Sequence, residues 1–270
     1  MDSFKEKTII FGVPKLFNLD IMIEAELKAI GFKTINISVH NNTFKYKNVF
    51  QHLESFFAKN ILQQGNYKKI LNFRQSKDGI KAQLEHIDQV DYIFIIRPEV
   101  YPFDFLKELK KKGKKMIGYQ WNGLKRYPDT IKYIPLFDRF FVFDEDDLDT
   151  PFVLPTTNFY PTTIPVDHSV ENTDVFYTGS FYRKRMATLC DLIEKCRALN
   201  LNVHYHLFAT RKKRFVPCNL NLTSSVLSYE RNIQYTYKTK VLLDLKVVEH
   251  DGLSFRVLEA LGFEKKLITN

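Results

Sequence analysis

The sequence predicts an α/β protein made of two tandem Rossmann-like βαβ domains. Short apolar strands alternate with amphipathic helices in both halves of the chain, and a proline- and threonine-rich segment between Thr150 and Val170 interrupts the alternation. We therefore expect an N-terminal domain over residues 1–150, a linker over 151–170 and a C-terminal domain over 171–270. Parallel sheets bind ligands beyond the carboxyl ends of their strands, so we expect the ligand in a cleft between the domains.

The strands expected in the first half are short apolar runs that end at turn residues. Thr8–Val13 ends at Pro14, and Asp91–Ile96 has the unbroken apolar pattern of a buried parallel strand that stops before Pro98. The helices carry apolar residues at three- and four-residue spacing and are followed by glycines. The basic segment Gln63–Asp78 stays unassigned. In chain order the expected elements are Thr8–Val13 (strand), Leu19–Ile30 (helix), Lys33–Val39 (strand), Val49–Leu62 (helix), Asp91–Ile96 (strand), Phe103–Lys112 (helix), Lys115–Tyr119 (strand) and Asp138–Phe143 (strand).

The same alternation restarts after the proline-rich segment. An apolar strand is followed by a turn at Gly179-Ser180, and the next helix places Leu189 and Ile193 on its inward face. The second half therefore repeats the βαβ pattern of the first. In chain order the expected elements are Asp174–Thr178 (strand), Arg185–Leu199 (helix), Asn202–Phe208 (strand), Ser228–Lys238 (helix), Val241–Leu245 (strand), Ser254–Leu261 (helix) and Lys266–Thr269 (strand).

The composition is that of a globular protein with an excess of positive charge. Hydrophobic residues make up 44% and charged residues 26% of the 270 positions, which excludes a disordered or fibrous chain. Lys and Arg number 40 against 31 Asp and Glu, and the formal net charge is +9. This balance favours anionic partners: a nucleotide, a phosphorylated substrate, a nucleic acid or an anionic membrane surface.

The termini and cysteines indicate a cytoplasmic protein. The first residues lack the apolar segment of a signal peptide, and no run of about 18 apolar residues could span a bilayer. Three cysteines, Cys190, Cys196 and Cys218, are too few for a disulfide framework. We expect them to be reduced thiols.

The segment His250–Gly262 is the densest local signal for a ligand site. It places Gly252 just before a helix, where free backbone N–H groups can bind a diphosphate. Glu259 lies on the same helix, and its carboxylate can accept hydrogen bonds from two ribose hydroxyls. Seven residues separate Asp251 from Glu259.

This arrangement resembles the nucleotide-sugar site of GT-B glycosyltransferases, in which an acidic residue is followed after seven residues by a glutamate. Asp174–Ser180 and the basic residues after it resemble the first strand and phosphate-side loop of that family's C-terminal domain. Ser228–Glu230 and Lys240–Asp244 are similar to the segments that contact the nucleobase, and Phe137–Asp144 resembles the last N-domain strand of bacterial surface-polysaccharide transferases.

The resemblance implies a metal-independent transfer of a sugar from a nucleotide-diphosphate donor to a glycan or lipid-linked acceptor in surface polysaccharide synthesis, with no cofactor. Asp251 departs from the family, which often has Glu there, and the chain stops at Asn270 where members usually continue. We therefore expect a short or truncated C-terminal domain. The residues implied to bind the donor are Gly179, Ser180, Arg183, Lys184, Arg185, Tyr229, Asp251, Gly252, Leu253, Ser254, Arg256 and Glu259.

An inverting transfer also needs a general base, whereas a retaining route needs none. Two acids follow strands of the first domain and are candidates: Asp20, after the loop of the first strand, and Glu99, directly after Asp91–Ile96. Trp121-Asn122-Gly123 follows another strand and reads either as a platform for the acceptor sugar or as part of the core.

Three further patterns have competing interpretations. Asp144-Glu145-Asp146 matches an Asp-x-Asp metal motif, but acids are also favoured where a helix begins, and we expect no metal site. His204 and His206 share one face of a strand, where packing is more common than metal ligation. The lysines of Lys107–Lys115 form a solvated helix end or contact anionic lipid headgroups.

A second functional class fits the same pattern: a non-catalytic two-domain protein that binds a small anionic or nucleotide ligand. Turnover of a donor sugar distinguishes the two classes. Nucleic-acid binding is not expected, because the lysines are scattered and no recognised nucleic-acid-binding module is present.

Overall fold

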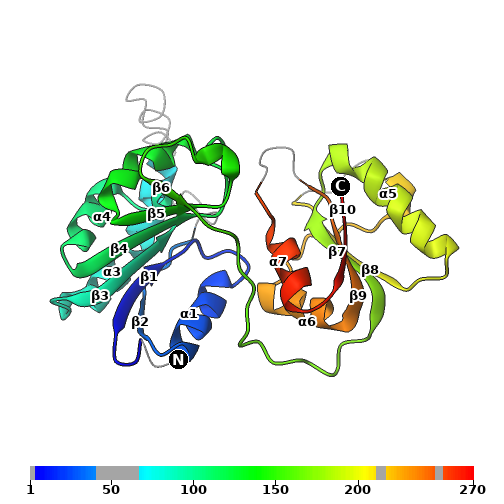
Figure 1. Ribbon diagram of the computed structural model, residues 1–270, viewed down its shortest axis with the longest axis horizontal. Helices are drawn as coiled ribbons and strands as arrows, with labels where there is room; N and C mark the ends of the chain where they lie inside the picture. The colour runs from blue at the N-terminus through cyan, green and yellow to red at the C-terminus, as the bar shows by residue number, and fades with distance from the viewer. Residues whose placement is uncertain (1–3, 41–66, 211–216, 247–251) are drawn as a thin grey trace. The chain divides into compact units, whose positions relative to one another are not determined.

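The computed structural model describes residues 4–40, 67–210, 217–246 and 252–270, which form two compact units (Figure 1). The first unit holds the described residues up to Thr157 together with Gly252, and the second holds the remainder from Asn158. No helix in these ranges is long and apolar enough to cross a membrane. The predicted helix Val49–Leu62 lies outside the described residues.

The first unit is built on a six-stranded parallel sheet with the order β2-β1-β3-β4-β5-β6. The order reverses between β1 and β3, and in sheets of this topology the ligand crevice lies at the carboxyl ends of those two strands. Its strands are β1 (Thr8–Gly12), β2 (Lys33–Asn36), β3 (Val90–Ile96), β4 (Gly113–Gln120), β5 (Arg139–Val142) and β6 (Val153–Pro155). Its helices are α1 (Leu19–Ala29), α3 (Tyr67–Glu85) and α4 (Phe103–Lys110), with 3-10 turns η1 (Pro98–Val100), η2 (Pro128–Leu136) and η3 (Glu145–Asp147).

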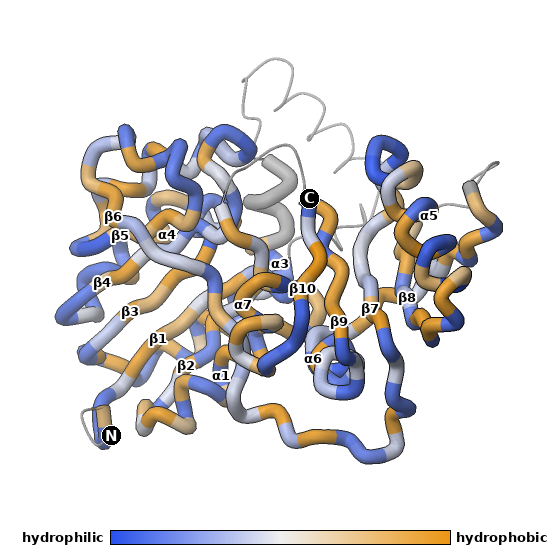
Figure 2. Tube along the Cα trace, turned by 45° about the vertical axis from the view of Figure 1, so that its right-hand side comes forward, coloured by the Kyte–Doolittle hydropathy of each residue, from blue (hydrophilic) through white to orange (hydrophobic). Residues whose placement is uncertain are grey.

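Apolar side chains of α3 and α4 pack in one cluster with one face of this sheet. Ile10 of β1 and Ile93 of β3 are fully buried with Phe73 of α3 and Leu106 of α4. Burial of side chains of this size contributes roughly 1.5–3 kcal/mol each to the free energy of unfolding. Figure 2 shows the strands of both sheets as mostly hydrophobic. The apolar runs that predicted the strands therefore supply the buried side chains of the core.

The second unit has a four-stranded parallel sheet with the order β10-β9-β7-β8. Here the order reverses between β7 and β9, so the carboxyl ends of those strands mark its crevice. Figure 1 shows α5 on one face of the sheet, and α6 and α7 on the other. The elements are β7 (Thr173–Ser180), α5 (Arg183–Ala198), β8 (Val203–Phe208), a 3-10 turn η4 (Pro217–Asn219), α6 (Tyr229–Lys238), β9 (Thr239–Asp244), α7 (Phe255–Gly262) and β10 (Lys266–Thr269).

Alternate residues of β7 pack against the helices on opposite faces of the second sheet. Val175 and Tyr177 pack with Leu189 and Ile193 of α5, whereas Phe176 packs with Ala260 of α7 on the opposite face. This is the two-residue period of a strand covered on both sides. Leu189 and Ile193 point inward, as their spacing predicted.

Several boundaries differ from the predictions, and three of the differences change the assignment of a residue or segment. Gly179 and Ser180 are not a turn but the last residues of β7, because β8 continues to Phe208 and pairs with both of them. Gly113 begins β4 rather than ending a helix, since it pairs with Val90. Within the predicted linker, Val153–Pro155 form β6 and pair with β5.

The cysteine prediction is wrong for two of the three residues. Cys190 of α5 and Cys218 of η4 form a disulfide with their Cα atoms 5.8 Å apart. They are 28 positions apart in the chain, and left-handed backbone at Cys218 and Asn219 (φ 51° at both) carries η4 back over the helix. Cys196 stays free and buried, and burial raises its pKa. With one disulfide among three cysteines, the sequence has no cysteine spacing pattern from which the pairing could be recognised.

Candidate functional site

Two helices of the second unit begin at the crevice between β7 and β9. Helix α5 follows the carboxyl end of β7, and α7 follows that of β9. Neither Tyr182, the N-cap of α5, nor Ser254, the N-cap of α7, uses its side chain as a cap. The free N–H groups of these first turns and the positive ends of the helix dipoles favour an anion at this edge.

The first turn of α5 carries positive charges where acids are normally favoured. Arg183, Lys184 and Arg185 stand there and no acid accompanies them, although cations at a helix N-terminus are disfavoured by the dipole. Arg183 and Lys184 are exposed and make no hydrogen bond or ion pair with any described residue. An anion bound at this turn would offset the unfavourable interaction of these cations with the helix dipole.

Arg185 ties the two strand ends of the crevice together. Its Nη1 donates to the carbonyl oxygen of Leu245 at 2.9 Å, beyond β9, and its Nη2 donates to that of Ser180 at 3.4 Å. Its buried Nε and the buried hydroxyl of Tyr177 have no hydrogen-bond partner within the described ranges. A Cβ on Gly179 would lie 2.8 Å from that hydroxyl, so any other residue there would displace the Tyr177 side chain. Burial raises the pKa of Tyr177, and the charge of Asp244 adds to the rise against the opposing effect of Arg185.

The start of α7 is anchored to the end of β9. The Ser254 hydroxyl donates to Asp244 Oδ2 at 2.6 Å, and the carbonyl oxygen of Leu253 accepts from Asn158 Nδ2 at 2.7 Å. Gly252 belongs to the first unit, where an added Cβ would meet the Phe143 ring at 2.5 Å. Asp251 lies outside the described residues. The predicted glycine loop is thus only partly a feature of the second unit.

Arg256 and Glu259 form a buried ion pair between α7 and α6. Arg256 Nη1 lies 2.8 Å from Glu259 Oε2, and Arg256 Nη2 donates to Asn232 Oδ1 at 2.9 Å. Asn232 Nδ2 in turn donates to Glu259 Oε1 at 3.4 Å. Glu259 is 1% exposed, and its Oε2 makes the ion pair but no hydrogen bond of good geometry with any described residue. These contacts occupy the guanidinium of Arg256 inside the helix interface, which speaks against its role as a phosphate clamp.

Tyr229 is placed beside this pair. It is the first residue of α6, which begins there because Ser228 Oγ accepts from Arg231 N at 3.2 Å. Its ring contacts that of Phe255 edge-on, with 6.2 Å between centroids. Helix α6 therefore contacts α7 at two points: Tyr229 meets Phe255 in the first turn of α7, and Asn232 meets Glu259.

In the first unit, Asp20 lies in the first turn of α1, which follows the carboxyl end of β1. It is 7% exposed and makes no hydrogen bond or ion pair with any described residue. Burial raises the pKa of Tyr101, and the negative charge of Asp20 adds to that rise. The dipole of α1 favours an acid in this first turn, and the carboxylate has no side-chain partner among the described residues.

Glu99 is held differently, inside a polar cluster at the carboxyl ends of β3 and β4. Its Oε1 accepts from Arg97 Nε at 2.8 Å, and its Oε2 accepts from Thr130 Oγ1 at 3.1 Å and from Gln120 Nε2 at 3.3 Å. Arg97 adopts left-handed backbone (φ 58°) and lies 4.0 Å over the Tyr127 ring. With both oxygens engaged, Glu99 is built to hold this edge together and is poorly placed to accept a substrate proton.

The remaining candidates have structural partners. Trp121 is 7% exposed. Asp144 Oδ1 accepts from Asp146 N at 3.4 Å and caps η3, and no group of three potential metal ligands occurs among the described residues. His204 packs against the rings of Phe176 and Tyr235, with centroids 5.6 and 4.1 Å away. The packing interpretation of His204 is confirmed.

Sequence reasoning missed several residues of these two edges. The residues are Arg97, Tyr177, Asn232 and Asp244. Arg97 carried a usable signal, because it is a charged residue directly between a buried strand and a proline. Asn232 carried none, since it meets the ion pair only when α6 packs against α7.

The sequence matches no model of a known protein family and no curated protein. Solved structures do share the fold. Trehalose-6-phosphate synthase OtsA aligns with a TM-score of 0.55 and 14% identity, over 97% of this chain and 84% of that one. An α-glucosyltransferase in complex with UDP-glucose and DNA containing an abasic site gives 0.53 and 12%, over 97% and 79%.

A third structure is a putative UDP-N-acetylglucosamine 2-epimerase from Listeria monocytogenes, with a TM-score of 0.53 and 9% identity over 97% of this chain and 78% of that one. At these identities the likeness shows the fold alone. It confirms the predicted fold class, an α/β protein with two Rossmann-like units of the kind found in GT-B glycosyltransferases.

Proposed function

We propose that this protein transfers a sugar from a nucleotide-diphosphate donor to a glycan or lipid-linked acceptor. The observation that carries the proposal is the crevice between β7 and β9. There three cations and no acid occupy the uncapped first turn of α5, and α7 begins without a side-chain cap. The sharing of this fold with a glucosyltransferase solved with UDP-glucose supports it.

In this proposal, different residues of the crevice bind different parts of the donor. Arg183 and Lys184, which lack partners in the described structure, and the N–H groups of the two helix starts bind the diphosphate. As the bond from the anomeric carbon to the diphosphate oxygen breaks, the electron pair stays on that oxygen, and the same cations stabilise the charge without a metal. Glu259 Oε2, which is ion-paired with Arg256 but lacks a hydrogen bond within the described structure, accepts one from a ribose hydroxyl.

In an inverting reaction the acceptor hydroxyl must lose its proton as it attacks the anomeric carbon. Of the two predicted acids, Asp20 fits this role, because its carboxylate is buried and unpartnered among the described residues, whereas both oxygens of Glu99 are engaged. We further propose that the acceptor belongs to surface polysaccharide synthesis. It rests on the resemblance of Phe137–Asp144 and on the lysines of Lys107–Lys115.

Calorimetry with UDP, GDP, ADP and CMP tests the donor site. The double variant Arg183→Ala/Lys184→Ala should bind the preferred nucleoside diphosphate about tenfold more weakly, because it loses two charge-assisted contacts. The matched control is Lys195→Ala/Arg197→Ala, which removes the same charge from the other end of α5. Equal losses in both variants would show that only net charge matters and would remove the site from α5.

Turnover separates a transferase from its alternatives. With the preferred nucleotide sugar, release of nucleoside diphosphate should fall about 10²–10⁴-fold in Asp20→Asn at unchanged nucleotide affinity. Binding without any turnover would favour the non-catalytic binding protein instead. Conversion of the donor sugar to its epimer would favour the reaction named for the Listeria neighbour.

A further inference from the structure

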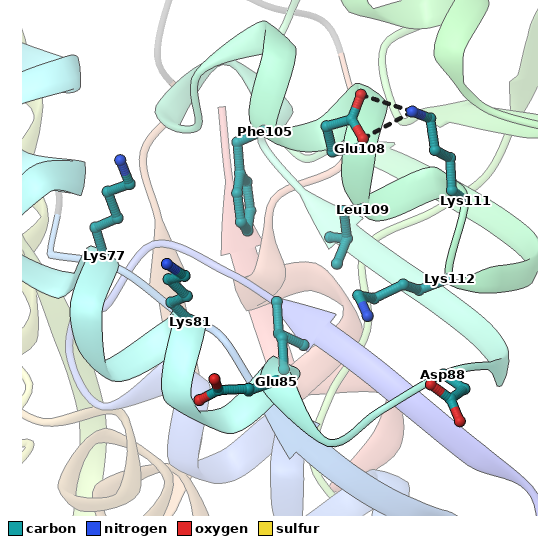
Figure 3. A pocket seen from close by; sticks show the side chains of 10 residues that line it. Lys77, Lys81, Glu85, Asp88, Phe105, Glu108, Leu109, Lys111 and Lys112 are labelled. Carbon is teal, nitrogen blue, oxygen red and sulfur yellow. Dashed lines mark hydrogen bonds and ion pairs between the residues drawn. The ribbon is translucent and has the colours of Figure 1, made fainter.

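A cavity of about 520 Å³ opens on the outer face of the first unit, between α3 and α4 (Figure 3). Leu84 of α3 and Leu109 of α4 form its buried floor. Phe105 stands between the two helices, and its ring is held by that of Phe73 with 4.6 Å between centroids. Leu84, Phe105 and Leu109 belong to the packed core of the unit, so the apolar floor is preformed, whereas the rim of the cavity is made of charged side chains.

The lysines around this cavity fall into two kinds. Lys111 Nζ donates to both carboxylate oxygens of Glu108, at 2.8 and 2.7 Å, and Lys112 Nζ donates to the carbonyl oxygen of Ile87 at 2.5 Å. Lys77 and Lys81 make no hydrogen bond or ion pair with any described residue. Figure 3 shows both of them projecting from α3 on the side of Phe105 that lies away from the Glu108–Lys111 pair.

Because two of the four lysines are already paired within the described structure and two are not, the free positive charge lies on one side of the cavity. Lys77 and Lys81 are one helical turn apart, where like charges repel and destabilise the helix, and an anion between them would reverse that repulsion. At the other end Asp88 lines the cavity on the side of Lys112, whereas Glu85 projects from α3 on the same side as Lys81 (Figure 3). The site therefore offers one cationic end, next to an aromatic wall, and an apolar floor.

We propose that this cavity binds a lipid phosphate, with one hydrocarbon chain over Leu84, Phe105 and Leu109 and the phosphate between Lys77 and Lys81. The cavity lies away from the proposed reaction site. Asp88 and Lys112 stand just before the amino ends of β3 and β4, whereas Asp20 and Glu99 follow the carboxyl ends of their strands. The proposal does not depend on nucleotide binding.

Calorimetry with octyl phosphate below its micelle concentration tests the proposal. We expect saturable binding, and affinities at least about tenfold lower for octyl glucoside, which lacks the charge, and for inorganic phosphate, which lacks the chain. Lys77→Gln/Lys81→Gln should weaken octyl phosphate binding about tenfold. The control Lys107→Gln/Lys110→Gln removes the same charge from α4 outside the cavity and should bind normally. Both variants should retain wild-type nucleotide affinity.

Flotation with phosphatidylcholine vesicles, with and without phosphatidic acid, distinguishes the two sources of such a ligand. Flotation that needs phosphatidic acid and is lost in Lys77→Gln/Lys81→Gln identifies a membrane lipid. Octyl phosphate binding without flotation identifies a free lipid phosphate. Equal binding of octyl glucoside, or unchanged binding by Lys77→Gln/Lys81→Gln, would overturn the proposal.

Discussion

Replacing Cys190 by serine should destabilise the second unit by about 3.6 kcal/mol. The substitution removes the bridge to Cys218, which closes a loop of 28 positions. In the chain-entropy treatment, a loop of that size restricts the unfolded chain by roughly 12 cal/mol/K, or about 3.6 kcal/mol at 25 °C. Because the bridge joins α5 to η4 within one unit, we expect the loss to be confined to that unit.

Urea denaturation followed by two signals measures this loss and its location. The single tryptophan of the chain, Trp121, lies in the first unit, so its fluorescence reports that unit, whereas far-ultraviolet circular dichroism reports both. With a slope near 2 kcal/mol/M, the dichroism midpoint of the second unit should fall by about 1.8 M. The fluorescence midpoint should not move.

Cys196 provides the matched control, since it is buried on the same helix and is not bridged. Cys196→Ala should cost only about 1 kcal/mol, the usual effect of a small change in packing. Reducing the wild-type protein should reproduce the Cys190→Ser result. A wild-type midpoint that does not respond to reductant, together with an unchanged midpoint in Cys190→Ser, would refute the reasoning.

The remaining predictions concern charge and ligands. Glu259→Gln should weaken nucleoside diphosphate binding by about 1–3 kcal/mol in calorimetry, and unchanged affinity would remove Glu259 from the site. Chelation by EDTA should leave that affinity unchanged. A loss of affinity that manganese restores would instead favour a metal site at Asp144 and Asp146. Burial lowers the pKa of His204, so the unfolded state takes up this proton at a higher pH than the folded state. The free energy of unfolding should therefore fall as the pH drops below about 6.5. His204→Phe should flatten that decline in denaturation measured between pH 7.5 and 5.5, and parallel slopes would contradict the assignment.

The sequence by itself determined the fold class and most of the element order, but it left helix α3 (Tyr67–Glu85) unassigned and placed β6 (Val153–Pro155) in a linker. Apolar runs such as Asp91–Ile96 and helical stripes such as Leu189 with Ile193 depend on periods of 2.0 and 3.6 residues, which are local properties of the backbone. Helix α5 was located from the chain alone, but its start was predicted at Arg185, so Arg183 and Lys184 were expected in a loop and lie instead in the first turn of α5. Most of the site elements were therefore readable before any packing was known.

Tertiary structure decided which side chains remain available for chemistry. Asp20 and Glu99 looked equivalent as acids after strands, but Glu99 meets Arg97, Gln120 and Thr130 only when β3, β4 and η2 come together. The pairing of Cys190 with Cys218 likewise depends on η4 folding back onto α5. A local pattern records what one element can present, whereas partners that come from distant elements are fixed only when those elements pack.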